Sequence, residues 1–248
     1  MRTRRNRNVL LSLSRDVPIL TFLWKWKLAT TSVLARRFFP LRTVKRAYNR
    51  LTELRQAGYL EFRTDPRGHN SVWVLTQKGF GAIRDLLPQL KEDGYKTENA
   101  YHDLICTAAQ LGDWVDGLPS GAGLVSEQEL RRYHPEFLPP WLPKIGRHRP
   151  DGFWRIPNGS GAKVVALEVE LSRKNGERYQ SAGYDYGRAQ GLNDVLWIVP
   201  SQGAASRIET HLKKAAPERA SIHAFVLLEN LLTNGWQAQV RRGAEQIG

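Results

Sequence analysis

Residues 149–156 read Arg-Pro-Asp-Gly-Phe-Trp-Arg-Ile, and residues 166–174 read Ala-Leu-Glu-Val-Glu-Leu-Ser-Arg-Lys. Between them, residues 157–161 read Pro-Asn-Gly-Ser-Gly, a composition typical of a turn. The apolar residues on both sides of this turn predict a β-hairpin. In such a hairpin, the strand that begins at Asp151 runs antiparallel to the strand that carries Glu168 and Glu170.

The hairpin gathers three carboxylates. Side chains alternate along a strand, so Glu168 and Glu170 share one face while Val169 and Leu171 take the other, which we expect to face the core. Neighbouring carboxylates repel one another unless a cation offsets their charge, and a divalent metal ion with oxygen ligands does so most directly. We therefore expect Asp151, Glu168 and Glu170 to bind Mg²⁺ or Mn²⁺.

Such an ion polarises a scissile phosphate and lowers the pKa of an attacking water. Lys174 follows Glu170 by four residues and is a candidate to contact the phosphate or orient the nucleophile. The alternative is a solvated surface, because alternating Glu residues on an exposed strand often pair with nearby Arg and Lys. The Pro-Asp pair at the strand start and the apolar residues around Glu168 favour the metal site.

The charge of the chain indicates a polyanionic partner. Lys and Arg number 37 against 24 Asp and Glu in 248 residues, a net charge of +13. Residues 1–100 hold 20 of the basic residues and only 8 of the acidic ones, so the excess lies in the N-terminal part. Double-stranded DNA is the expected partner.

The N-terminal part predicts a winged helix-turn-helix domain, within residues 1–90. Helices are expected over residues 16–28, 30–39 and 41–57, followed by a hairpin of strands 59–63 and 72–76. One-signed charge on the third helix favours DNA contact over a merely solvated face. The cations expected at the DNA are Arg42, Lys45, Arg46, Arg50 and Arg55 on that helix, Arg67 and His69 at the hairpin tip, and Arg4 and Arg5 in a basic arm.

Residues 91–248 predict a second, α/β domain with a mixed central sheet. Besides the hairpin at 150–172, helices are expected over 98–114, 176–190 and 204–215, and strands over 194–199 and 222–228. The apolar runs are too short to cross a membrane. Cys106 is the one cysteine, which excludes an internal disulfide and is most simply a small buried side chain, so a cytoplasmic location is expected.

The hairpin resembles the PD-(D/E)xK nuclease superfamily. Pro150-Asp151 matches its PD element, and Glu168-Val169-Glu170 matches its (D/E)xK element, with Glu170 where the superfamily usually has Lys. The resemblance implies a restriction-endonuclease-like domain and a metal-dependent endonuclease. It also implies a further acid on the helix before the hairpin, for which the candidates are Asp103 and Glu98.

The whole chain resembles the MobC-type (MOBC) plasmid mobilisation proteins and the replication-relaxation proteins. The resemblance is carried by the winged helix, residues 101–104 (Tyr-His-Asp-Leu), residues 149–152 and residues 167–174. It implies a relaxase, which nicks one DNA strand at a plasmid transfer origin during conjugation. The implied partners are duplex DNA, an accessory relaxosome protein and a second copy of the chain in a homodimer.

Three points stay open in the sequence. The nucleophile is expected to be water, but Tyr179, Tyr184 and Tyr186 follow the acidic strand and are alternatives; no His residues have the paired spacing of common relaxases. His102 and His148 are weak candidates for metal ligands or proton shuttles. The function itself has two alternatives: a non-catalytic winged-helix DNA-binding regulator, and a double-strand endonuclease of restriction or transposition type.

Overall fold

The computed structural model describes residues 10–40, 43–64, 71–111, 121–159, 161–242 and 245–246. The chain mixes helices and strands and divides into two compact units. Unit 1 comprises residues 1–107 and 131–137, and unit 2 comprises residues 108–130 and 138–248. The division therefore lies further along the chain than the boundary expected at residue 90.

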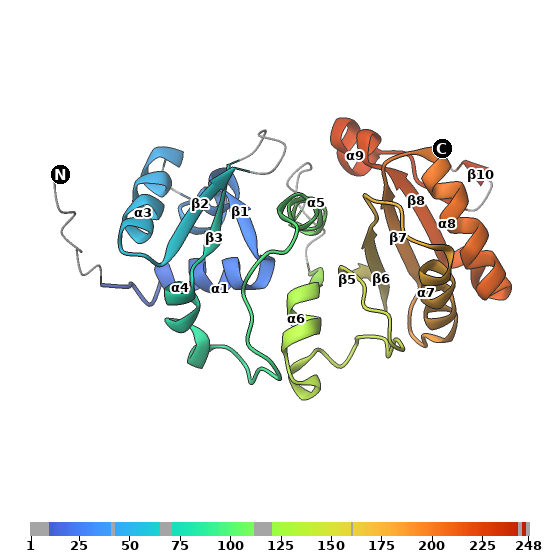
Figure 1. Ribbon diagram of the computed structural model, residues 1–248, viewed down its shortest axis with the longest axis horizontal. Helices are drawn as coiled ribbons and strands as arrows, with labels where there is room; N and C mark the ends of the chain where they lie inside the picture. The colour runs from blue at the N-terminus through green and yellow to red at the C-terminus, as the bar shows by residue number, and fades with distance from the viewer. Residues whose placement is uncertain are drawn as a thin grey trace. The chain divides into compact units, whose positions relative to one another are not determined.

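Unit 1 is built from the helices and the hairpin that the sequence predicts, together with shorter elements. In chain order it contains α1 (Asp16–Trp26), β1 (Leu28–Thr30), α2 (Thr31–Phe38), α3 (Val44–Gln56), β2 (Leu60–Thr64), β3 (Ser71–Leu75), α4 (Gln77–Gly81), the 3-10 turns η1 (Arg84–Leu86) and η2 (Pro135–Phe137), and the first turns of α5 (Ala100–Leu111). The three strands form an antiparallel sheet in the order β1-β3-β2 (Figure 1).

Threonine caps begin three of these helices. The hydroxyl of Thr30 accepts a hydrogen bond from the Val33 N–H at the start of α2, and Thr43 and Thr76 make the same bond at α3 and α4. Each cap satisfies one backbone donor that the first helical turn leaves without a partner. Trp24 of α1 and Trp73 of β3 are completely buried and anchor the core of unit 1.

Unit 2 contains a seven-stranded sheet. Its elements are β4 (Gly123–Ser126), α6 (Glu127–Arg132, whose last two residues belong to unit 1), β5 (Gly152–Asn158), β6 (Gly161–Val169), α7 (Gly176–Arg188), β7 (Asp194–Val199), α8 (Gln202–Ala215), η3 (Pro217–Ile222), β8 (His223–Leu227), α9 (Leu228–Asn234), η4 (Gly235–Gln237), β9 (Arg241–Arg242) and β10 (Glu245–Gln246). The strand order is β10-β9-β8-β7-β6-β5-β4. Strands β6, β7 and β8 are parallel and the other pairs antiparallel, so the sheet is mixed, as predicted.

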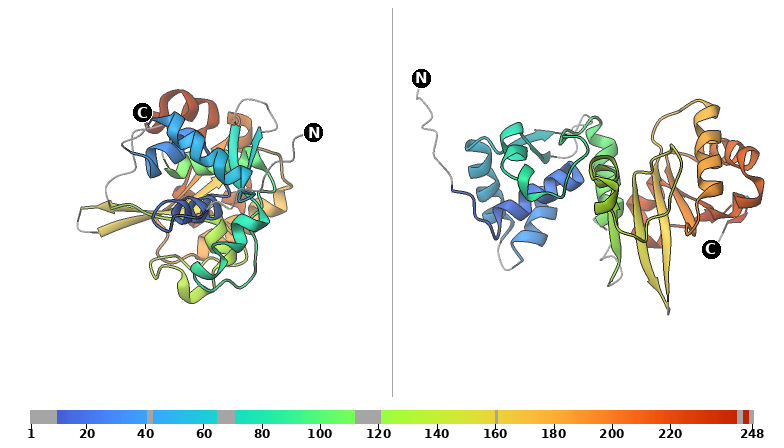
Figure 2. Two further views of the ribbon diagram at one scale, coloured as in Figure 1. Left: turned by 90° about the vertical axis from the view of Figure 1, so that its left-hand side faces the viewer. Right: turned by 90° about the horizontal axis from the view of Figure 1, so that it is seen from below.

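The β5–β6 hairpin is antiparallel, as the sequence predicts. Its register runs from Gly152 opposite Leu167 to Asn158 opposite Gly161. Gly159 in the turn has a φ of +57°, a conformation that residues with a Cβ rarely adopt. The hairpin projects beyond the neighbouring strands (Figure 2), because β4 pairs only as far as Arg155 and β7 pairs only from Val165 onwards.

Helices α7 and α8 pack side by side against one face of this sheet (Figures 1 and 2). Val164 and Ala166 of β6 share one hydrophobic cluster with Ala182 of α7 and Ile208 of α8. A Cβ on Gly183 would lie 3.1 Å from side-chain atoms of Leu212 and Ala215, so glycine allows this close approach of the two helices. No described helix is long and apolar enough to span a membrane.

Candidate functional site

Asp151 stands directly before β5 and is tied to β6 through its backbone and its side chain. Its N–H donates to the carbonyl oxygen of Leu167 (2.9 Å), and its Oδ2 accepts from the N–H of Val169 (2.7 Å). Its own carbonyl oxygen accepts from the side-chain amide of Gln110 (3.0 Å). The carboxylate is therefore fixed at the end of the strand that carries Glu168.

Glu168 is only 6% exposed, although it lies near the end of a strand. Its Oε1 accepts a hydrogen bond from the hydroxyl of Tyr186 and contacts Nε2 of His148. Glu170 is 5% exposed, and its N–H donates to the carbonyl oxygen of Ile198 (2.9 Å). Both glutamates are thus buried, which rules out the solvated-surface interpretation.

Lys174 forms an ion pair with Glu170, with 2.7 Å between Nζ and Oε2. Burial lowers the pKa of Lys174, but the hydrogen bond to Glu170 and the charges of Glu170, Glu168 and Asp151 raise it, and the net result is a raised pKa. Because the ammonium interacts with all three acids, the four residues form one electrostatic cluster. The roles that the sequence predicts for these residues in metal binding and phosphate contact stay predictions.

His148 is also a member of this cluster. From the sequence it is only a weak candidate for a metal ligand or proton shuttle. Burial lowers its pKa, whereas Glu168, Asp151 and Asp185 favour the charged imidazole, and the net effect is a raised pKa. Its backbone N–H donates to Oδ2 of Asp185 (2.8 Å). The pKa of Glu168 is also raised, because burial outweighs the contact with His148. No local motif marks His148, since its partner Glu168 lies 20 residues further along the chain.

Asp151, Glu168 and Glu170 are not arranged as the ligands of one metal ion. Among the described residues, the donor atoms of Asp151, Glu168 and Glu170 do not all lie within 4.8 Å of one another. Glu168 is held by His148, and Glu170 is held by Lys174. Two of the three carboxylates thus already have a nitrogen partner within the protein.

The three candidate tyrosines of α7 have different surroundings. Tyr186 is completely buried against Glu168. Tyr179 is 2% exposed, and its hydroxyl accepts from the backbone N–H of Lys174 (3.2 Å). Tyr184 is 48% exposed, with the guanidinium of Arg188 4.0 Å from its ring centre. Burial of Tyr179 and Tyr186 favours packing and hydrogen bonding over nucleophilic attack for these two.

The two candidates for a further acid both lie in unit 1. Asp103 is buried and pairs with Lys27 (3.0 Å), and it also accepts a hydrogen bond from Thr97. Its pKa is lowered, because the hydrogen bonds from His102, Thr97 and Lys27 and the charge of Lys27 outweigh the effect of burial. Glu98 is exposed and pairs with Arg131 (3.1 Å). Each acid therefore has a cationic partner within its own unit.

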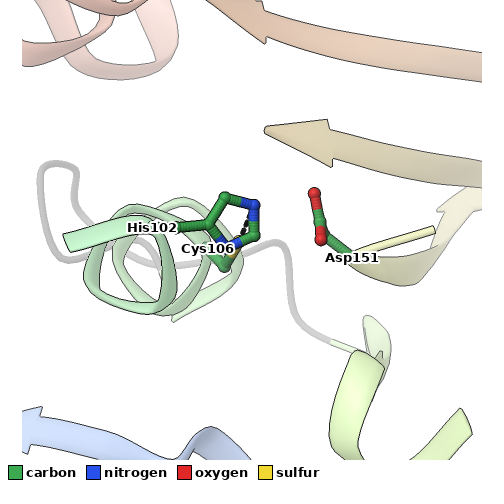
Figure 3. Close-up of side chains that lie close together, drawn as sticks. All are labelled: His102, Cys106 and Asp151. Carbon is green, nitrogen blue, oxygen red and sulfur yellow. Dashed lines mark hydrogen bonds between the residues drawn. The ribbon is translucent and has the colours of Figure 1, made fainter. Parts of the chain in front are cut away.

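His102 and Cys106 lie one turn apart on α5, with 3.6 Å between Nδ1 and the sulfur (Figure 3). The i, i+4 spacing on a helix accounts for this contact. Cys106 is buried, in agreement with its interpretation as a small core side chain. Asp151, the third residue drawn in Figure 3, belongs to unit 2, where it precedes β5.

The cations expected at DNA divide into three groups. Lys45, Arg46 and Arg55 are exposed on α3. Arg50 instead pairs with the completely buried Asp16 and with Glu53 (2.7 Å), which raises the pKa of Arg50, so this side chain serves the interior of unit 1. Arg4, Arg5, Arg42, Arg67 and His69 lie outside the described residues.

A cavity of about 550 Å³ lies beside α3. It is lined by Arg15, Phe38, Phe39, Pro40, Arg46, Asn49, Arg50 and Glu53. The end of α2 contributes its apolar wall, and α3 contributes most of its polar wall. The exposed cation Arg46 therefore stands at a hollow in the surface of α3.

Comparison of the chain with family models, with curated proteins and with solved structures gives no match.

Proposed function

We propose that this protein is a metal-dependent DNA endonuclease that nicks one strand at a plasmid transfer origin. The observation that carries the proposal is the cluster of Asp151, Lys174 and the two buried glutamates Glu168 and Glu170 at the end of a mixed sheet. Three carboxylates and one lysine at such a place are a costly arrangement that a structural role does not require. Nicking at a transfer origin rests on the resemblance of residues 101–104, 149–152 and 167–174 to MobC-type proteins.

The donor set fits a hard divalent cation. Carboxylate oxygens are the protein ligands that Mg²⁺ prefers, and Mn²⁺ accepts them as well. The cluster already stabilises positive charge, since Lys174 and His148 both have raised pKa values there. Asp151, Glu168 and Glu170 would hold the ion.

A bound ion of this kind supplies polarisation of the phosphate and a water of lowered pKa. Lys174 would then leave Glu170 and contact the phosphate, for which its partial exposure of 35% gives access. His148 holds the carboxylate of Glu168 in place from the other side. Water is the proposed nucleophile, because two of the three tyrosines nearby are buried.

Contact with duplex DNA is assigned to the exposed face of α3. Lys45, Arg46 and Arg55 stand there, and the excess positive charge of the chain lies in its first 100 residues. Contacts from such cations to phosphates provide affinity that weakens as the salt concentration rises. Unit 1 would therefore supply binding, and unit 2 would supply cleavage.

The main alternative is a non-catalytic DNA-binding regulator. It is favoured by Glu170 in the position where related nucleases usually carry Lys, and by the ion pair that already joins Glu170 to Lys174. The second alternative, a double-strand endonuclease of restriction or transposition type, uses the same cluster but gives a different product. The experiment must therefore distinguish cleavage from binding, and one cut strand from two.

The test uses supercoiled plasmids with and without a cognate transfer origin, incubated with Mg²⁺ or Mn²⁺ and with the accessory proteins supplied. Wild-type protein should produce open circles only with the origin and the metal. Glu168→Gln removes the charge of one metal ligand and should lower the nicking rate at least about 100-fold. The matched control is Glu177→Gln, an exposed glutamate at the start of α7, which should leave the rate unchanged.

The products separate the three functions on an agarose gel. Linear DNA would identify a double-strand endonuclease. Plasmid that is bound but stays supercoiled under every condition would establish the regulator. Cleavage that persists in Glu168→Gln would remove the cluster from the active site.

A further inference from the structure

The hydroxyl of Tyr186 lies in surroundings that make it a hydrogen-bond donor. The side chain is completely buried on α7, and its hydroxyl donates to Oε1 of Glu168. The phenol therefore acts as a hydrogen-bond donor to this carboxylate.

Two side chains meet at the same oxygen of Glu168. Nε2 of His148 contacts Oε1, the same atom that accepts from Tyr186. The two rings are packed edge to face, with 5.2 Å between their centres and an angle of 72°. Both contacts thus hold one oxygen of the carboxylate, Oε1.

The ring of Tyr186 is itself rigidly packed. Trp197 lies edge to face with it at 6.5 Å, and the ring centre of His223 is 6.0 Å away. The preceding residue, Asp185, accepts a hydrogen bond from the backbone N–H of His148. This bond fixes the loop that carries His148. A Cβ on Gly146 would lie 2.1 Å from Oδ1 of Asp185, so a larger residue there would displace this carboxylate.

We propose that Tyr186 is a positioning residue that locks Oε1 of Glu168 and thereby directs Oε2 to the divalent metal ion. The inference rests on the proposed metal-dependent function. Outer-shell groups of this kind orient ligating carboxylates, and their loss costs metal affinity. Tyr186 therefore acts through Glu168, in place of the nucleophilic role that its position in the sequence suggests.

The test is the substitution Tyr186→Phe, which keeps the ring and removes the hydrogen bond. Mn²⁺ binding is measured by titration calorimetry on the metal-free, full-length protein. We expect affinity to fall about 10- to 100-fold relative to wild type. Glu177→Gln, an exposed residue at the start of the same helix, is the control and should bind Mn²⁺ as the wild type does.

A second readout separates positioning from stability. Thermal unfolding of both variants is recorded in EDTA, and nicking is measured as a function of Mn²⁺ concentration. Positioning predicts that Tyr186→Phe needs more Mn²⁺ to reach half its maximal rate. A variant with a lower melting temperature and an unchanged Mn²⁺ affinity would overturn the inference.

The outcomes distinguish this inference from the proposed function. If wild-type protein binds no Mn²⁺, the proposed function fails and the inference fails with it. If wild type and Tyr186→Phe bind equally, only the role of Tyr186 is lost. If Tyr186→Phe does not fold, the wild-type Mn²⁺ complex decides by crystallography: metal on Oε2 supports the inference, and metal on Oε1 overturns it.

Discussion

His223 shows how burial sets the charge of a single residue. The side chain is 2% exposed on β8, and its Nδ1 accepts a hydrogen bond from Nε1 of Trp197 (3.2 Å). Burial, together with the charge of Arg219, lowers its pKa from 6.5 to about 4. The folded protein therefore contains neutral His223 at neutral pH, with Nδ1 as an acceptor.

This lowered pKa predicts a pH dependence of stability. Between pH 6.5 and about 4 the unfolded chain binds a proton at His223 that the folded chain does not, so the free energy of unfolding falls as pH falls. The contribution is fully present above pH 6.5, and about 3 kcal/mol is lost on reaching pH 4. Urea denaturation at a series of pH values measures it.

The control for this prediction is His223→Asn, which keeps an acceptor near Trp197 and cannot take up a proton in this range. Its free energy of unfolding should depend less on pH between 6.5 and 4 than that of wild type. Identical pH dependence in the two proteins would show that His223 is charged in the folded state or accessible to water.

Individual residues were the hardest feature to predict from the sequence. Alternation predicts that Glu168 and Glu170 share one face, but their burial depends on neighbours such as Tyr186 and Ile198, which come later in the chain. Arg50 has the spacing of an exposed cation on α3, yet its partner Asp16 lies 34 residues earlier. The sequence pattern identifies such residues, whereas contacts with distant parts of the chain decide their roles.

At the scale of elements, local signals were sufficient for most of the fold. The β5–β6 hairpin has Gly159 in its turn, and α7 begins with the Asn175 side chain accepting from the N–H of Arg178 (3.2 Å). Several short elements were missed, namely β1, β4, α4, α6, α9, β9 and β10. A segment of a few residues carries little periodicity.

Helix α4 contains two glycines with different surroundings, so substitutions at both can test how this helix packs. A Cβ on Gly79 would lie 2.2 Å from the carbonyl oxygen of Tyr59, whereas a Cβ on Gly81 meets no atom within 4 Å. Gly79→Ala should lower the free energy of unfolding by about 1–3 kcal/mol, because backbone must move. Gly81→Ala should leave it unchanged or raise it by less than about 1 kcal/mol.

Thermal or urea denaturation of the two variants measures the difference. Because alanine favours helix more than glycine, propensity alone predicts that both substitutions stabilise. Equal stability of Gly79→Ala and Gly81→Ala would mean that α4 does not pack against Tyr59 as described.

At the scale of the whole molecule, the sequence correctly predicts a mixed α/β chain with a basic N-terminal part. The boundary between the two units is harder to predict from the sequence, because residues 131–137 return to unit 1 after the chain has entered unit 2. Tyr133 stacks on Trp24 (5.2 Å between ring centres), and Leu90 forms a β-bridge to Tyr133. A return of this kind leaves no compositional signal, since it depends on contacts between distant segments.

The central claim is that Asp151, Glu168 and Glu170 form a divalent metal site that serves DNA cleavage. Anomalous diffraction from crystals of the wild-type protein grown in saturating Mn²⁺ tests it most directly. We predict a Mn²⁺ peak coordinated by oxygens of Asp151 and Glu168, with Glu170 released from Lys174. A cluster without Mn²⁺, in which His148 and Lys174 keep their ion pairs with Glu168 and Glu170, would contradict the account.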